Sequence, residues 1–148
     1  MDKQEFRSFG GLKVTIRKEF LNMEPFDVQV VRKGQEYGLC QVPGAVGHGY
    51  NSGHQVVNLC WHLGVRRVVL MGFDMRRVDG KSHWEGHDGH PGQPSSPEEY
   101  DMYMLPFFPK LAEDLEKDGS MKVVNGTVGS ALTCFEFTTL DAELGRLC

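Results

Sequence analysis

The sequence lacks the features that mark several large classes of protein. No apolar run approaches the roughly 18 residues of a membrane span, and the opening stretch MDKQEFRSFG contains no signal-peptide core. Lysine and arginine form no basic cluster and the net charge is −4, so a nucleic-acid partner is not expected. The cysteines form no CxxC pair, which favours a reducing cytoplasm over a disulfide framework. We therefore expect a cytoplasmic protein without a membrane span.

Several well-known catalytic signatures are missing as well. The sequence contains no GxGxxG after a strand, no GxxxxGK[ST], no GxSxG and no HExxH. These motifs bind dinucleotides, cradle phosphates, expose a nucleophilic serine or hold zinc. Their absence argues against Rossmann dehydrogenases, P-loop enzymes, α/β-hydrolases and zinc proteases.

What is present indicates one globular α/β domain covering residues 1–148. Hydrophobic residues make up 40% of the chain and charged residues 24%, ordinary values for a folded domain. Alternating and β-branched segments predict strands at 12–16, 26–31, 68–71 and 121–125, with a short strand at 37–41 and another at the end of 129–137. Helical spacing predicts helices at 52–63, at 97–118 with a break at Pro106 and Pro109, and at 139–147. This order predicts an open, mostly parallel Rossmann-like sheet with helices on its faces.

The helix predicted at 52–63 and the strand after it form the clearest unit. Asn51 or Ser52 is a suitable cap at its start, and Gly64 follows its end. Helical spacing predicts a buried face made of Val56, Leu59, Cys60 and Leu63. The apolar run at 68–71 predicts a strand buried on both faces. We expect residues 28–31, 68–71 and 122–124 to lie in one sheet.

The stretch GKSHWEGHDGHPG, residues 80–92, follows that strand and is rich in histidine. His83, His87 and His90 suit general bases, because imidazole titrates near neutral pH. With Asp88 they could instead bind zinc, although the spacing matches no standard zinc pattern. A solvated polar loop is the third alternative.

Two further features belong at the carboxyl end of the predicted sheet, where open α/β folds bind ligands. Asn51, Ser52 and Gly53 begin a helix, whose free N–H groups and dipole favour an anion. Asp74 follows the strand at 68–71 and could orient a hydroxyl or a histidine. Plain helix capping and turn capping are the structural alternatives.

Four stretches in order carry a resemblance to a known family. They are NSGHQVVNLCWHLGVRRVVLMGFDM, GKSHWEGH, PEEYDMYMLPFFPKLAEDLEKDG and VVNGTVGSALTCF. Between about residues 6 and 135, the chain resembles a largely phage-borne family with an NSG…GxDM…SHW…HP pattern. That family is similar to the bacterial sialyltransferases of glycosyltransferase family forty-two and, more distantly, to the MptE-like pterin diphosphokinase group.

The resemblance implies a glycosyltransferase-like domain that binds a CMP- or UDP-linked sugar and needs neither a metal nor another cofactor. In S-H-W-E-G-H it makes His87 the general base and puts Trp84 in an aromatic position. The implied catalytic residues are His87 and Asp74, and the implied nucleotide- or substrate-binding residues are Asn51, Ser52, Gly53, His83, Trp84, His90, Asn125 and Ser130.

One departure keeps other functions open. Both families begin with a strand and a glycine-containing phosphate loop, and this sequence starts after the matching point. We therefore expect the first βα unit of the family to be missing and the chain to form a homo-oligomer. The alternatives are a non-catalytic binding or assembly module and an ATP-dependent, diphosphokinase-like enzyme. The latter would need clustered carboxylates for Mg²⁺, and Asp74, Asp79 and Asp88 form only a loose set.

Overall fold

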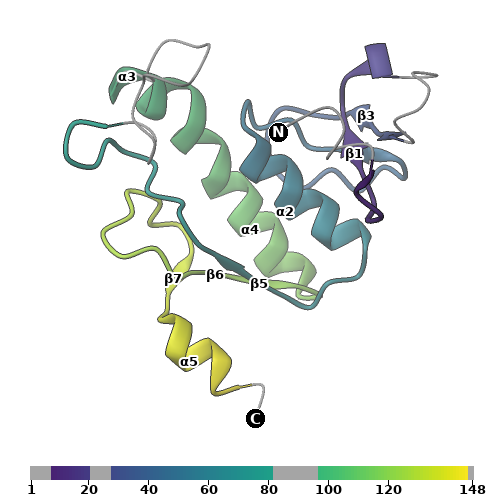
Figure 1. The fold of residues 1–148 in the computed structure, drawn as a ribbon. Helices are drawn as coiled ribbons and strands as arrows, with labels where there is room; N and C mark the ends of the chain where they lie inside the picture. Colours follow the sequence, from purple (N-terminus) through teal and green to yellow (C-terminus); the bar gives the residue numbers. More distant parts are fainter. Residues whose placement is uncertain (1–7, 21–27, 82–96, 147–148) are drawn as a thin grey trace.

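The structure is a computed structural model that describes residues 8–20, 28–81 and 97–146 (Figure 1). The strands are β1 (Val14–Thr15), β2 (Gln29–Val30), β3 (Arg32–Lys33), β4 (Ala45–Val46), β5 (Arg67–Leu70), β6 (Lys122–Asn125) and β7 (Glu136–Phe137). The helical segments are η1 (Lys18–Phe20), α2 (Ser52–His62), α3 (Pro97–Glu99), η2 (Tyr100–Met104), η3 (Leu105–Phe107), α4 (Phe108–Asp118) and α5 (Leu140–Leu144). The described chain thus combines helices with small parallel sheets, and none of its helices has the length and apolar character needed to cross a membrane.

The largest sheet has the order β5-β6-β7 with all strands parallel. Helices α2 and α4 lie side by side over the same face of this sheet (Figure 1). The core between these layers is apolar and includes Val57 from α2, Phe108, Leu111 and Leu115 from α4, Leu70 from β5 and Val123 from β6. Because the strands are parallel, the carboxyl ends of β5 and β6 meet at one edge of the sheet.

Residues 28–34 belong to a separate parallel arrangement. The N–H groups of Gln29 and Val31 donate to the carbonyls of Lys13 and Thr15, at β1. The N–H groups of Arg32 and Gly34 donate to the carbonyls of Gly44 and Val46, at β4. Strand pairs β1-β2 and β3-β4 are both parallel, so this extended segment has partners on both of its edges. The prediction that residues 28–31 share a sheet with β5 and β6 is therefore wrong, because nearer segments already occupy those edges.

The buried face of α2 also differs from the prediction. Val56 and Leu63 are more than half exposed, whereas His54, Val57 and Asn58 are buried. Val56 lies with Leu59 along an open hollow of about 330 Å³ between α2 and β1. The predicted buried face was based on hydrophobic residues alone and so left out His54 and Asn58. These two side chains point inward because they hydrogen-bond to the loop before α2.

That loop contains no strand at residues 37–41, where a short one was predicted; β4 forms further along the chain instead. Leu39 and Cys40 are nevertheless buried. The N–H group of Cys40 donates to Asn58 Oδ1 at 3.0 Å, and Asn58 Nδ2 donates to the Cys40 carbonyl at 3.1 Å. The side chain of Asn58 thus substitutes for the neighbouring strand that would otherwise satisfy this backbone.

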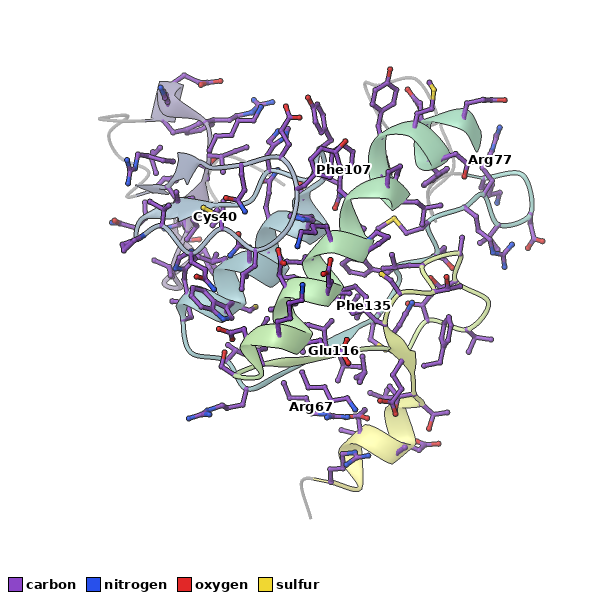
Figure 2. All side chains as sticks on the ribbon, turned by 180° about the vertical axis from the view of Figure 1, so that it is seen from behind. Cys40, Arg67, Arg77, Phe107, Glu116 and Phe135 are labelled. Atoms are coloured by element: carbon purple, nitrogen blue, oxygen red, sulfur yellow. The ribbon has the colours of Figure 1, made fainter. Side chains whose placement is uncertain are left out.

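Strand β5 is not buried on both faces, contrary to the prediction. Leu70 points into the core, but Val68 and Val69 are only partly buried and Met71 is half exposed. Within the described residues, α2 and α4 cover one face, while α5 approaches the other through Arg67 (Figure 2). The apolar run therefore reflects one packed face and one open face.

The broken helix after Pro97 is confirmed. A π-helical turn, η2, is followed by the 3₁₀ turn η3, which contains Pro106, and Pro109 lies in the first turn of α4. Gly119 ends α4 with φ 69°, a left-handed conformation that glycine adopts without strain. The strand at β6 and the helix at α5 also form where they were predicted.

Candidate functional site

The candidate site begins at the first turn of α2. Asn51 is extended, with φ −143° and ψ 153°, and its Oδ1 accepts a hydrogen bond from the His54 N–H group at 2.8 Å. Its Nδ2 donates to the Gly49 carbonyl at 2.7 Å, which fixes the chain just before the helix. Ser52 is exposed at the helix start. The backbone amides of this turn point out of the helix and can donate to an anion.

The end of β5 reaches this helix start through Phe73. A methyl group added to Gly53 would come within 2.5 Å of the Phe73 ring, so the ring lies directly against the backbone of α2. The same ring meets Phe108 of α4 edge to face, with centroids 6.4 Å apart. The structure therefore brings together the two segments that the sequence assigned to one ligand.

The loop after β6 is tied to the end of β5 by side chains. Thr127 Oγ1 accepts from the Phe73 N–H group at 3.0 Å and donates to the Leu70 carbonyl at 3.4 Å. Ser130 Oγ donates to the Phe73 carbonyl, and the Ala131 N–H group donates to the Asp74 carbonyl at 2.9 Å. These bonds hold the two loops together at the carboxyl edge of the sheet.

Asn125 and Ser130 therefore have structural roles. Asn125 is fully buried; its Nδ2 donates to the Leu132 carbonyl and its Oδ1 accepts from the Thr127 N–H group, both at 3.0 Å. Ser130 is also buried, and its Oγ accepts from the Leu132 N–H group at 3.0 Å. Their contact with a nucleotide stays a prediction, and in this conformation both side chains already bond within the protein.

Asp74 lies at the same edge, half-buried, with Arg77 and Tyr100 nearby. Burial raises the pKa of the Tyr100 phenol; the negative charge of Asp74 adds to this rise and the positive charge of Arg77 opposes it. Arg77 lies beside the start of the helical segment at Pro97 (Figure 2). The edge thus carries a carboxylate, a guanidinium and a phenol from two separate segments.

Residues 82–96 connect those two segments. His83, Trp84, His87 and His90 fall within them and lie outside the described residues, so their roles stay predictions. The chain enters this stretch through a tight hairpin in which Val78 and Lys81 exchange backbone hydrogen bonds of 3.0 and 2.9 Å. Asp79 and Gly80 form its turn with φ 50° and 74°. An Asp-Gly pair is a strong sequence signal for such a turn, although this turn was not predicted.

Two other residues near the site have left-handed backbone conformations. Tyr50, directly before Asn51, and Met75, directly after Asp74, both have φ 50°. Such a conformation costs a residue other than glycine about 1–3 kcal/mol and often accompanies a functional site. Neither was foreseen, because an isolated tyrosine or methionine gives no sequence signal for positive φ.

Other reactive groups are sparse in the described part of the chain. Its residues contain no group of three or more His, Cys, Asp or Glu side chains that could hold a metal ion. Burial raises the pKa of the Cys134 thiol to about 11 and also raises that of Cys60, which makes both poor nucleophiles.

Compared with models of known protein families, with curated proteins and with solved structures, the chain matches none.

Proposed function

We propose that the chain binds the nucleotide of an activated sugar between the first turn of α2 and the carboxyl ends of β5 and β6, and that it transfers the sugar to a hydroxyl acceptor. The observation that carries this proposal is the contact between Phe73 and Gly53. It unites a helix start, which favours an anion, with the sheet edge at which α/β folds bind ligands. The resemblance to sialyltransferases supplies the reaction type.

The phosphate of the donor would accept hydrogen bonds from the amides at Ser52 and Gly53. Ser52 is exposed, so its hydroxyl can add a further donor, and Asn51 orients the turn through its two hydrogen bonds. The helix dipole stabilises negative charge at this end by about 0.3–1 kcal/mol. This charge grows on the phosphate as the bond to the sugar breaks, so the same amides stabilise the leaving group.

Transfer requires a base for the acceptor hydroxyl, and His87 is the proposed one on the strength of the S-H-W-E-G-H resemblance. The imidazole takes the hydroxyl proton while the acceptor oxygen bonds to the anomeric carbon. The bond from that carbon to the phosphate oxygen breaks, and the nucleotide leaves with the electron pair. A positioned base contributes roughly 10²–10⁴-fold to the rate. Asp74, which follows β5 at the carboxyl edge of the sheet, is proposed to orient the imidazole.

A non-catalytic binding module is the second candidate. The positions that the resemblance assigns to the later nucleotide contact, Asn125 and Ser130, have their side chains hydrogen-bonded within the protein. A scaffold whose polar side chains support its own loops can retain ligand binding without catalysis. The two candidates differ in whether CMP is released from CMP-sialic acid.

A charge substitution at the helix start tests the proposal without disturbing the fold. In thermal-shift titrations with CMP, UDP, CMP-sialic acid and ATP, a ligand at 100 times its Kd adds about 2.7 kcal/mol of stability. Ser52→Asp keeps a residue that suits a helix N-terminus but places a negative charge where the phosphate would lie. Ser52→Asn is the matched neutral control.

We expect a nucleotide to stabilise the wild type and Ser52→Asn, but not Ser52→Asp. If no nucleotide stabilises the wild type, or if all three proteins respond equally, the proposed site is wrong. Release of CMP from CMP-sialic acid, lost in His87→Ala, would favour the transferase over the binding module.

A further inference from the structure

Three of the four tyrosines of the chain lie on one surface outside the proposed nucleotide site. Tyr37, Tyr50 and Tyr103 come from the loop before β4, the residue before Asn51 and the π-helical turn η2. Tyr37 and Tyr50 pack on Phe107, which directly precedes α4 (Figure 2), and Tyr103 belongs to the helical turn just before it. We call Tyr37, Tyr50 and Tyr103 the tyrosine platform.

The platform has a rigid base and an exposed surface. Phe107 is only 4% exposed; it stacks against Tyr37 at 4.7 Å between centroids and meets Tyr50 at a tilt of 42° and 5.0 Å. Tyr37, Tyr50 and Tyr103 are 52%, 47% and 50% exposed. Tyr103 lies close enough to Tyr50 to act on its phenol electrostatically. Half-exposed rings held by a buried partner present apolar surface at little cost in side-chain entropy.

Polar groups of both signs surround these rings. The Tyr50 hydroxyl donates to Glu36 Oε1 at 2.9 Å, and Lys33 Nζ lies 5.8 Å from the centre of the Tyr50 ring. His48 meets the same ring edge to face at 4.6 Å. Glu36 is exposed, so its second carboxylate oxygen can accept a hydrogen bond from a ligand. The rim thus combines donors and acceptors and is close to neutral in charge.

Backbone geometry indicates that this arrangement is not incidental. Tyr50 keeps φ 50°, a strained conformation for a tyrosine, and this turns its ring onto Phe107. Tyr103 projects from a π-helical turn, which is rare in proteins and often occurs at functional sites. Contiguous exposed apolar surface with a polar rim is typical of a binding site.

From these contacts we propose that the tyrosine platform is a carbohydrate-binding subsite. The face of a pyranose ring carries C–H groups that pack on an exposed aromatic ring, while its hydroxyls both donate and accept hydrogen bonds. Lys33, His48 and Glu36 supply the matching partners. A nucleic acid suits the surface less well, because the rim is not basic and the chain has a net charge of −4.

The identity of the sugar rests on the proposed function: the platform would hold the acceptor glycan. Tyr50 directly precedes Asn51, so the platform borders the helix start that is proposed to bind the donor. An acceptor held there would lie next to the activated sugar. The carbohydrate subsite itself does not depend on that assignment.

A glycan array probed with the full chain is the direct test, followed by NMR titration of the strongest glycan found. Tyr37→Ala and Tyr103→Ala each remove one exposed ring, and we expect each to weaken binding about tenfold. Tyr37→Phe retains the ring and should bind like the wild type. Met102→Ala removes an exposed apolar side chain of the same helical turn and is the matched control.

The outcomes separate this proposal from the nucleotide site. Retention of no glycan on the array, or unchanged glycan affinity in both tyrosine-to-alanine variants, overturns the carbohydrate subsite. A fall in CMP affinity that matches the fall in glycan affinity also overturns it, because the rings would then stack a nucleobase. Glycan binding without any CMP binding would retain the platform and reject the donor site.

Discussion

Phe73 and Gly53 are in direct contact: a methyl group on Gly53 would come within 2.5 Å of the Phe73 ring. Gly53 lies in the first turn of α2 and Phe73 just after β5, so the contact sets the distance between the helix start and the sheet edge. A larger residue at either position changes that spacing.

Gly53→Ala should therefore show a coupling with Phe73. In a Phe73→Ala background, alanine at 53 should be neutral or stabilising, because alanine favours helix over glycine by up to about 1 kcal/mol. With Phe73 present, the ring must move, and we expect a coupling energy of about 1 kcal/mol in the opposite direction. Urea unfolding of the four proteins measures it. Simple additivity of the two substitutions would mean that the ring does not press on the helix.

Asn58 should be among the most sensitive positions in the chain. It is fully buried and hydrogen-bonds both backbone groups of Cys40 and the N–H group of Gly47. Asn58→Leu leaves three buried backbone groups without partners, which should lower the free energy of unfolding by about 3 kcal/mol or more. Glu116→Ala, at an exposed position of α4, should change it by less than about 0.5 kcal/mol. If Asn58→Leu lowered the free energy of unfolding as little as this control does, the structural role of Asn58 would be contradicted.

The elements with strong local signals could be predicted from the sequence. Strand β6, the broken helix before α4 and the glycine at its end follow from β-branched residues, two prolines and Gly119. The partners of β2 could not be predicted, because strand pairing depends on which segments meet in space. The face of α2 could not either, since His54 and Asn58 are buried through hydrogen bonds to a loop distant in sequence.

The same distinction applies to the candidate site. A cap at Asn51 and an acidic residue after β5 could be identified, because caps and strand ends have recognisable sequence patterns. The contact between Phe73 and Gly53, the cross-links of Thr127 and the tyrosine platform depend on tertiary packing. The hairpin at Asp79-Gly80 is the exception, since its sequence signal was present and was missed.

Stability should fall as the pH drops below neutral because of His54. This residue is fully buried; its Nδ1 lies 3.3 Å from the Gly47 carbonyl, and none of the described residues offers its Nε2 a hydrogen-bond partner. Burial lowers the pKa of His54, the Gly47 carbonyl opposes this shift and His48 adds to it. The unfolded chain, with a pKa of about 6.5, therefore binds a proton before the folded protein does.

Stabilisation from neutral His54 is thus complete above about pH 7 and declines as the pH falls through about 6.5 towards the lower folded pKa. Denaturant unfolding between pH 8 and 5 measures this decline. His54→Gln should flatten it, while Val56→Ala, exposed on the same helix, should retain it. An equally steep decline in His54→Gln would assign it to other groups.

A second loss of stability should appear at strongly acidic pH. Glu143 accepts hydrogen bonds from Arg67 Nε at 2.6 Å and Nη2 at 2.9 Å and from Thr138 Oγ1 at 2.7 Å. Arg67 and then Thr138 lower the pKa of Glu143 to about 2. The contribution is therefore complete above the unfolded pKa of about 4.3 and is lost as the pH falls towards 2.

Glu143→Gln removes this titration, and acid unfolding followed by circular dichroism measures the change. The variant should be less stable at pH 7 but lose less stability between pH 4.5 and 2 than the wild type. Glu116→Gln is the matched control on an exposed helix face and should keep the wild-type profile. If the stability of Glu143→Gln and of the wild type depended on pH in the same way, the stabilising role of the Arg67–Glu143 ion pair would be contradicted.

The proposed nucleotide site between α2 and the sheet edge is tested most directly by an amide NMR titration with CMP. Binding at the helix start predicts the largest shift changes at the amides of Ser52 and Gly53, with smaller ones at Phe73 and Asp74, and predicts their loss in Ser52→Asp. Residues of α5, such as Glu143, should not respond. Absence of any shift change at Ser52 and Gly53 at millimolar CMP, or changes confined to another part of the chain, would contradict the account.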